Sequence, residues 1–198
     1  HIGDRRQRQM CIRDRFGEWF VVTTNVDALF ERNGFDPQRV YSPQGDYGLG
    51  QCRRPCTTDT WPSKPWIENL LPKVDRNTQL LADQDLPRCP NCGGPTFFNV
   101  RCAHWFVEEP WEKGRRNWEH WLAQNRTNNI VAIDIGSGFN TPIWVRWPLE
   151  QITTLQPGNT LIRLNRDHPD VPAQIKAQSI CFQEDPLDVL TKLIQHLH

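Results

Sequence analysis

Short β-rich runs that end abruptly in polar residues recur along this chain, and helical patterns follow them. Residues 21–27 read Val-Val-Thr-Thr-Asn-Val-Asp, after which Val26, Leu29 and Phe30 mark one face of a short helix that Gly34 ends. Residues 39–46 repeat the design, with a strand that ends in the turn Pro-Gln-Gly-Asp. In a doubly wound sheet such corners lie at the carboxyl ends of strands, where ligands bind.

The second half of the chain contains three more strand patterns. Residues 130–135 are an unbroken β-branched run, typical of a buried parallel strand, and end in Gly136-Ser137-Gly138, where small residues let a nucleotide approach the backbone. A bare Gly-Ser-Gly is more often a simple turn. Residues 160–165 form a core strand that ends in Asn165, and residues 179–182 another, followed by a helix with Asp185 as its N-cap. Strands alternating with helices predict an α/β fold with a parallel sheet.

Six cysteines follow residue 50, and four of them form two close pairs with the spacing of metal ligands. Each pair can present two thiolates to one ion, and Gly93-Gly94 allow a tight turn after the second pair. Disulfides of a secreted protein, or buried free thiols, are the alternatives, but no secretory signal is visible. Neither pair contains a His or a carboxylate, so we predict a closed, structural zinc site held by Cys52, Cys56, Cys89 and Cys92.

The remaining patterns favour structural roles. Cys102 and Cys181 lie in apolar, strand-like contexts and are interpreted as small core residues. Residues 57–88, rich in Pro, Thr, Asp and Trp, predict an irregular insert with a short helix over 66–71. Residues 111–124 predict a helix whose Trp face packs on the core. His104 and His120 have no carboxylate or nucleophile partner in their motifs, so neither is interpreted as catalytic.

Composition predicts one cytoplasmic domain with a small insert. The chain has 198 residues, of which 37% are hydrophobic, and no apolar run approaches the length of a membrane span. Residues 1–15 carry five Arg and two Asp, and without them 18 of the 23 basic and 21 of the 23 acidic side chains remain, a net charge of −3. We therefore expect neither nucleic acid nor a membrane as a partner.

The first fifteen residues require a separate interpretation. They have no apolar periodicity and back-translate into a sequencing adapter, so we interpret residues 1–15 as an artefactual tail. A natural basic arm that contacts nucleic acid or an acidic partner is the alternative. On the first interpretation Met10, the only methionine, is not a start, and the gene is truncated at its 5′ end.

The motifs, taken in order, resemble the catalytic core of the sirtuin (Sir2) family. Residues 24–27, a short helix, a strand ending in Gly45-Asp46 and paired cysteines carry this resemblance. Residues 44–48 and 136–142 resemble, more narrowly, the macrodomain-linked class M sirtuins. The resemblance implies a Rossmann-like parallel sheet over 16–50 and 104–198, with a small zinc-ribbon module inserted at 51–103. We find no Gly-Ala-Gly-x-Ser phosphate loop, and therefore expect an incomplete sheet and weak NAD binding by the chain as given.

The resemblance also implies an activity, the cleavage of the nicotinamide–ribose bond of NAD. Gln44 stands where deacylating sirtuins carry a His base, and an amide does not take up a proton near neutral pH. The implied function is protein ADP-ribosyl transfer, with a lysine deacylase and an inactive zinc-stabilised binding module as alternatives. A lipoyl-carrier protein is a candidate acceptor, and a macrodomain a candidate partner. The implied catalytic residues are Asn25, Asp27 and Gln44; the implied NAD-binding residues are Thr24, Asn25, Asp27, Gly136, Ser137, Gly138 and Asn165.

Overall fold

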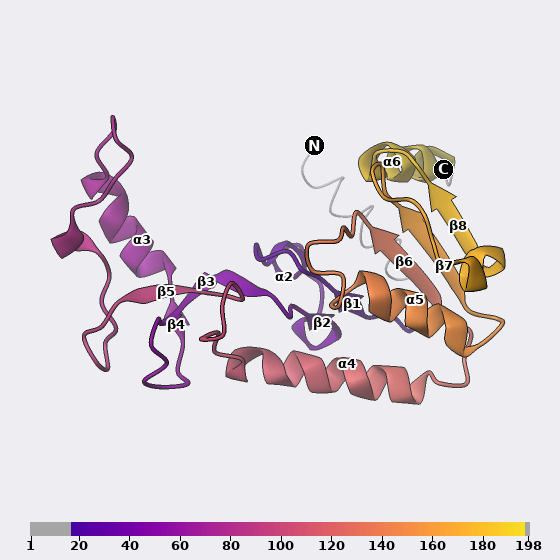
Figure 1. Ribbon diagram of the computed structural model, residues 1–198, viewed down its shortest axis with the longest axis horizontal. Coiled ribbons are helices and arrows are strands. Elements are labelled where there is room, and N and C mark those ends of the chain that lie inside the picture. Colours follow the sequence, from indigo (N-terminus) through magenta and orange to yellow (C-terminus); the bar gives the residue numbers. More distant parts are fainter. Residues whose placement is uncertain (1–16, 197–198) are drawn as a thin grey trace. The chain divides into compact units, whose positions relative to one another are not determined.

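The computed structural model describes residues 17–196 (Figure 1). By its internal contacts the chain divides into two compact units, one ending at Glu119 and the other beginning at His120. The tail interpreted above as an artefact lies outside the described residues. The predicted boundaries of the sheet domain and the insert stay a prediction, and each unit is described by itself.

The first unit begins with the two strand-and-corner patterns that the sequence predicts. Strand β1 (Val21–Val22) pairs in parallel with β2 (Val40–Tyr41). Helix α2 (Leu29–Arg32) and a 3₁₀ turn (Pro37–Arg39) connect them. The helix begins three residues later than its apolar pattern indicates, because Ala28 adopts a left-handed φ of 50° and the Asp27 carboxylate accepts a hydrogen bond from the Leu29 amide at 3.1 Å.

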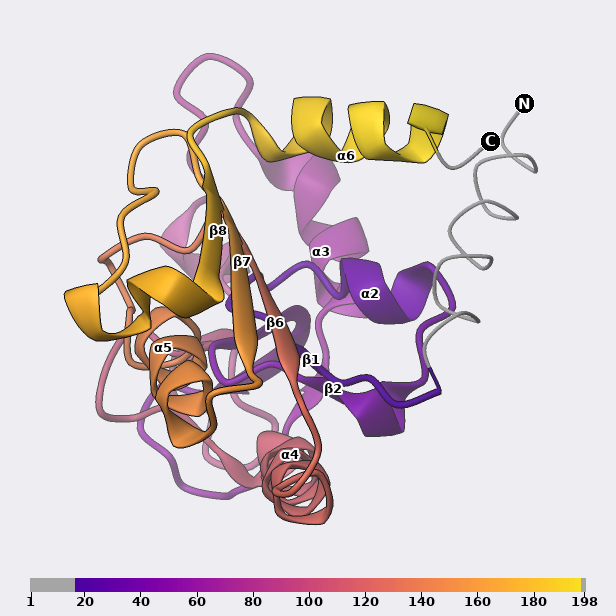
Figure 2. The ribbon, with the colours of Figure 1, turned by 90° about the vertical axis from the view of Figure 1, so that its right-hand side faces the viewer.

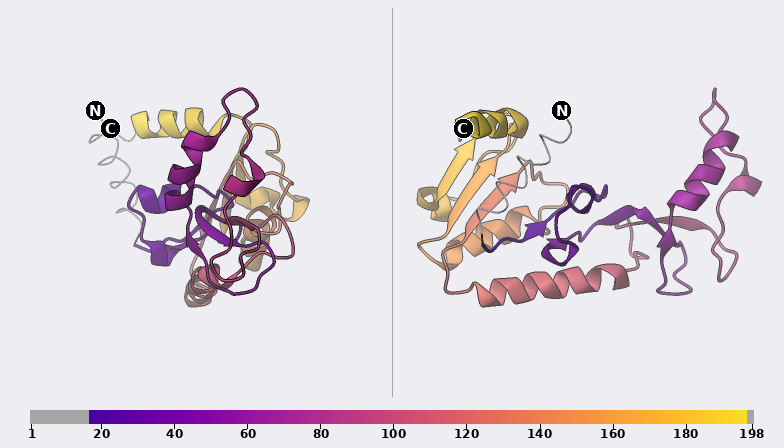
Figure 3. Two further views of the ribbon diagram at one scale, coloured as in Figure 1. Left: turned by 90° about the vertical axis from the view of Figure 1, so that its left-hand side faces the viewer. Right: turned by 180° about the vertical axis from the view of Figure 1, so that it is seen from behind.

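The insert is a small antiparallel sheet with the strand order β4-β3-β5, seen from behind in Figure 3. Its strands are β3 (Gly45–Cys52), β4 (Trp61–Pro62) and β5 (Thr96–Val100). The predicted short helix is confirmed as α3 (Lys64–Leu70), and two 3₁₀ turns, Leu71–Lys73 and Asp83–Asp85, follow it. The Trp66 ring of α3 packs on Phe98 of β5 with 4.9 Å between centroids, which holds the helix on the sheet.

The predicted Trp-rich helix is α4 (Glu112–Gln124), preceded by a 3₁₀ turn (Glu109–Trp111). No residue of α4 is fully buried. The tryptophans of the turn and the helix are half-buried, and they make polar as well as apolar contacts. The indole of Trp111, at the end of the turn, donates to the Asn99 side chain at 2.6 Å, while Trp118 of α4 packs on Phe20. The Trp face therefore packs as predicted, but without forming a closed core.

The second unit is a three-stranded parallel sheet in the order β6-β7-β8, which Figure 2 shows. The strands are β6 (Val131–Ile135), β7 (Thr160–Leu164) and β8 (Ser179–Phe182). Helix α5 (Arg146–Leu155) and a 3₁₀ turn (Ala173–Gln178) connect them, and α6 (Pro186–His196) closes the unit. The predicted N-cap is confirmed, because Asp185 accepts from the Leu187 amide at 2.8 Å.

One buried apolar cluster of this unit lies on a single face of the sheet. Ala132, Leu161 and Ile175 are buried there, with Leu149 of α5 and Val171 packed against them. The prediction of a strand buried on both faces at 130–135 is wrong, because β6 alternates and its side chains at 131, 133 and 135 are each more than half exposed. Among the described residues no helix is both long and apolar enough to cross a membrane.

Candidate functional site

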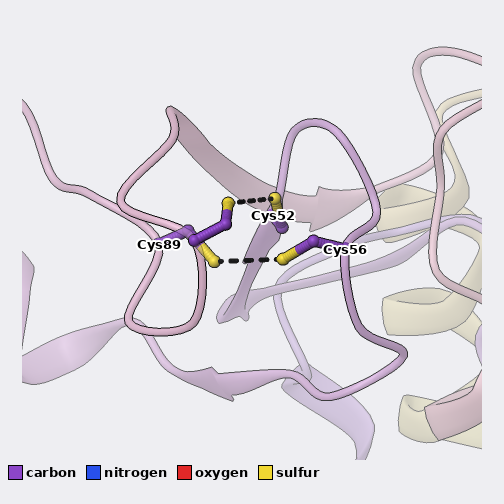
Figure 4. Close-up of side chains that lie close together, drawn as sticks. Cys52, Cys56 and Cys89 are labelled. Carbon is purple, nitrogen blue, oxygen red and sulfur yellow. Dashed lines mark hydrogen bonds between the residues drawn. The ribbon is translucent and has the colours of Figure 1, made fainter.

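The four predicted zinc ligands come together in one cluster. All four sulfurs lie within 4.8 Å of one another, with 3.7 Å between Cys52 and Cys92 and 3.6 Å between Cys56 and Cys89 (Figure 4). These thiols are free, and the distances are far longer than a disulfide bond of about 2.05 Å. Zn–S bonds of about 2.3 Å in a tetrahedron place sulfurs about 3.7 Å apart, so the cluster fits a four-thiolate zinc site.

Local backbone geometry positions the ligands. Cys52 ends β3, and the second pair sits in a tight turn in which the Cys89 amide donates to the Gly94 carbonyl at 2.8 Å and the Gly93 amide to the Cys89 carbonyl at 2.9 Å. Gly93 has a φ of 68°, a left-handed conformation that glycine adopts without strain. The glycines after the second pair therefore serve the turn, as the sequence predicts.

The thiols differ in their environment. Burial raises the pKa of the Cys52 thiol, but hydrogen bonds with the backbone of Cys56 and Arg54 lower it by more, so that this pKa lies at about 7. At Cys56 a hydrogen bond from the Asn91 side chain lowers the thiol pKa. Burial and the neighbouring thiols together raise this pKa by more, so that it lies at about 12. Thiolates this close repel one another, and a divalent cation would remove that repulsion and hold all four ionised.

Cys102 and Cys181 lie outside the cluster. Both are exposed, so the prediction that they are core residues is wrong. Cys102 follows the end of β5 in a bend, and Cys181 lies in β8 with its side chain exposed. An apolar sequence context does not indicate which face of a strand is covered.

The predicted NAD-cleaving residues follow two adjacent strands. Thr24, Asn25 and Asp27 come after β1, and Gln44 comes after β2; because the strands are parallel, both segments leave the same edge of the sheet. The Tyr47 amide donates to the Val26 carbonyl at 3.0 Å, which ties the two corners together. The structure therefore groups these residues, with Asn25 exposed and Gln44 buried to 8% exposure.

The turn that carries Gln44 is held rigidly by its backbone. The Gln44 carbonyl accepts from the Arg101 amide, and the Pro43 carbonyl from the Arg101 guanidinium, both at 2.9 Å. Gly45 has a φ of 86°, and a Cβ there would lie 2.0 Å from the Asn99 carbonyl oxygen. Only glycine fits this position, which explains the Gln-Gly pair in the motif.

The predicted nucleotide-binding loop lies in the second unit. Gly136, Ser137 and Gly138 follow β6, and Asn165 follows β7 at the same strand edge. The Asn165 amide donates to the Ser137 carbonyl at 2.9 Å and accepts from the His168 amide at 2.8 Å, so it joins the two loops. The Ser137 hydroxyl is buried and has no hydrogen-bond partner within residues 17–196.

Beneath this loop lies a buried charge network that sequence reasoning missed. Arg163 and Asp134 are both fully buried and form an ion pair at 2.7 Å, and Glu150 contacts Arg163 at 2.9 Å. The Asp134 carboxylate also accepts from the Ser137 amide at 3.2 Å, and the Arg146 guanidinium donates to the Ser137 carbonyl at 3.1 Å. The sequence did contain a signal for this network. Asp134 and Arg163 carry opposite charges, and they occupy paired positions of two mostly apolar strands.

Comparison with known proteins links the chain to two curated relatives. It is 36% identical over 150 residues to a Fusarium oxysporum protein described as a probable bifunctional ADP-ribose hydrolase/ADP-ribosyltransferase, and the match covers 73% of this chain and 25% of that protein. It is 25% identical over 181 residues to a Staphylococcus aureus protein ADP-ribosyltransferase, with 90% of this chain and 57% of that protein covered. The chain thus spans a quarter of the Fusarium protein and somewhat over half of the Staphylococcus protein.

Solved structures show the same fold. Sir2Af2 bound to a myristoylated histone peptide matches with a TM-score of 0.53 and 18% identity, over 89% of this chain and 63% of that one. A Sir2 homologue mutant in complex with 2′-O-acetyl-ADP-ribose matches with a TM-score of 0.56 and 17% identity, over 96% and 65%. No family model matches the chain. Its fold is nevertheless that of the solved Sir2 proteins, and its cysteine cluster is compatible with a structural zinc ion.

Proposed function

We propose that this chain is the catalytic part of an NAD-dependent protein ADP-ribosyltransferase of the class M sirtuin type. The observation that carries the proposal is the position of Gln44. A neutral amide stands beside the Asn25 and Asp27 corner, at the strand end where a deacylating sirtuin needs a base. The names of both curated relatives support transfer of ADP-ribose, and the solved Sir2 complex with 2′-O-acetyl-ADP-ribose supports use of NAD.

Transfer of ADP-ribose breaks the bond between C1′ and the nicotinamide nitrogen, and nicotinamide leaves with the bonding electrons. A nucleophile of the acceptor protein then forms a bond to C1′ and loses its proton. The Asn25 amide suits recognition of ribose hydroxyls, and the Asp27 carboxylate suits stabilisation of the positive charge that develops on the sugar. Neither step requires a base at position 44.

The second loop is suited to the adenosine part of NAD. The buried Ser137 hydroxyl has no partner among the described residues, and a hydroxyl or phosphate oxygen of a nucleotide would satisfy it. The small residues Gly136 and Gly138 leave the backbone accessible, with no atom within 4 Å of a Cβ built at either position. The network beneath the loop holds Ser137 through its backbone amide and carbonyl.

Asn25→Ala is expected to abolish labelling of a protein acceptor by NAD. Asn25 is exposed, so its removal leaves the fold intact but takes away a positioning contact, and the rate should fall by about 100- to 1,000-fold. Transfer of radiolabel from NAD to acceptor protein, measured with the full-length protein, tests this expectation. The matched control is Asn69→Ala on α3, which removes another exposed amide and should retain full activity.

Gln44 should separate ADP-ribosyl transfer from deacylation. The full-length protein should label an acceptor from NAD and show little deacetylation of an acetyl-lysine peptide, because acyl transfer to the sugar needs a base at this position. Gln44→Ala should reduce labelling less than Asn25→Ala if Gln44 only orients the ribose, and by a comparable amount if it also holds the acceptor. Rapid deacetylation without labelling would contradict the proposal and favour the deacylase, whereas inactivity in both assays would favour a zinc-stabilised binding module.

A further inference from the structure

A cavity of about 580 Å³ lies beside the loop that joins the first two zinc ligands. Arg53, Arg54 and Pro55, which stand between Cys52 and Cys56, form one side of it. Pro95, His104 and Trp105 also line it. The volume is in the range of sites that bind small molecules or several residues of a peptide.

The walls of the cavity are held in place by the insert sheet. The Arg53 amide donates to the Pro95 carbonyl at 3.0 Å, and the Trp105 carbonyl accepts from the buried Gln51 side chain at 2.8 Å. The Trp105 ring packs edge-on against Phe97 of β5, with 5.3 Å between centroids. The cavity is therefore built on backbone ladders and a buried amide rather than on a loose surface loop.

The ionisable side chains that line the cavity are all basic. Two arginines and a histidine line it, and no acidic residue does. Within residues 17–196 the side chains of Arg53 and Arg54 form no ion pair, whereas Arg101, Arg115 and Arg163 each pair with a carboxylate. A concave surface with one sign of charge concentrates ions of the opposite sign, so the preferred occupant is an anion.

The shape and the charge together favour an acidic peptide over the other anions. A single phosphate would fill only a small part of a cavity of 580 Å³ and would leave the Trp105 and proline walls without a partner. Nucleic acid requires an extended basic surface, and this chain has a net charge of zero. Arg and Trp side chains are also those that most often anchor protein interfaces.

Strand β3 connects the cavity with the proposed reaction corner. Gln44 precedes the first residue of β3 and Cys52 is its last. The irregularity between Asp46 and Gly50 shortens the strand, whose ends pair with positions only four residues apart on β5, so the two sites lie on the order of 15 Å apart. Both belong to the first unit. An extended acceptor segment of about five residues would reach from one site to the other.

We infer that this cavity is a docking site for an acidic, partly apolar segment of the protein acceptor. The inference rests on the proposed function for the identity of the partner, because a protein ADP-ribosyltransferase must bind an acceptor protein. Carboxylates of the segment pair with Arg53 and Arg54, and an apolar side chain packs on Trp105.

The arginines have an alternative role, in which they compensate the negative charge of a metal site instead of binding a peptide. A zinc ion with four thiolates carries a formal charge of −2, and the guanidinium groups of Arg53 and Arg54 lie in the loop between two of its ligands. Trp105 contributes nothing to that compensation. A variant at Trp105 therefore separates peptide docking from support of the metal site.

The test is fluorescence anisotropy of a labelled eight-residue peptide with six Glu and two Leu, measured on the full-length zinc-loaded protein without NAD. Arg53→Glu combined with Arg54→Glu should weaken binding at least tenfold, and Trp105→Ala at least threefold, with zinc content unchanged. The matched control reverses two exposed cations of the same insert, Lys64→Glu with Arg76→Glu, and should change binding less than twofold. A peptide with Gln in place of Glu should not bind.

Several results would overturn the inference. If the control pair weakened peptide binding equally, the attraction would be a general effect of charge. If the arginine variant lost zinc while Trp105→Ala bound the peptide normally, the arginines would serve the metal site. Displacement of the peptide by inorganic phosphate at the same concentration would show a simple anion site. Equally tight binding of a short single-stranded RNA would exclude selectivity for acidic peptides. Because NAD is absent, failure of the proposed transferase activity leaves this result unaffected.

Discussion

Cys56→Ser is expected to release zinc from the protein and to unfold the insert. Cys56 is exposed, so the substitution removes almost no packing, and its effect reports the metal. Structural zinc contributes on the order of 10 kcal/mol to the folding of small domains, and the loss of one of four thiolates removes most of that contribution. Metal analysis should fall from one zinc per chain to almost none.

The insert itself provides the second readout. The cysteine cluster holds both ends of residues 57–88, a segment with a single short helix and few buried side chains. Limited proteolysis should therefore cut this segment in Cys56→Ser but not in the parent protein. Cys102→Ser is the matched control, because Cys102 is exposed and lies outside the cluster. One zinc per chain retained in Cys56→Ser would contradict the four-thiolate assignment.

Arg163→Met should destabilise the second unit by about 3–5 kcal/mol. Met has a similar length and packs as an apolar side chain, but it leaves the fully buried Asp134 carboxylate without its cation. The unpaired charge, rather than lost packing, causes the effect. Urea unfolding followed by far-UV circular dichroism measures the loss in free energy of unfolding.

A double variant separates the two causes. Arg163→Met combined with Asp134→Asn removes both charges, so the free energy of unfolding should recover in large part. The control Arg166→Met removes an exposed arginine whose partner, Asp167, is also exposed, and should change stability by less than about 0.5 kcal/mol. A double variant as unstable as Arg163→Met would show that packing, and not the buried ion pair, dominates.

Local features of this protein were readable from its sequence. Each of these features depends on contacts within a few residues, so a short sequence pattern is enough to predict it. Examples are the cysteine spacing, the turn at Gly93, the N-cap Asp185 and the polar ends of β1 and β2. The parallel sheet was predictable for the same reason, because strands that alternate with helices connect in a limited number of ways. The cysteine cluster followed from the chemistry of metal ligands as much as from fold.

Burial, in contrast, was decided by tertiary structure. Whether a side chain is covered depends on which distant segment packs on its face, and no short pattern contains that information. Cys102 and Cys181 are exposed and β6 is covered on one face only, while Arg163 is buried because α5 and the loop after β7 supply its acceptors. The hydrogen bond between Ser137 and Asn165 joins residues 28 positions apart, and the cavity brings the loop between Cys52 and Cys56 together with Trp105. Both exist only in the folded chain, because each is made by segments distant in sequence.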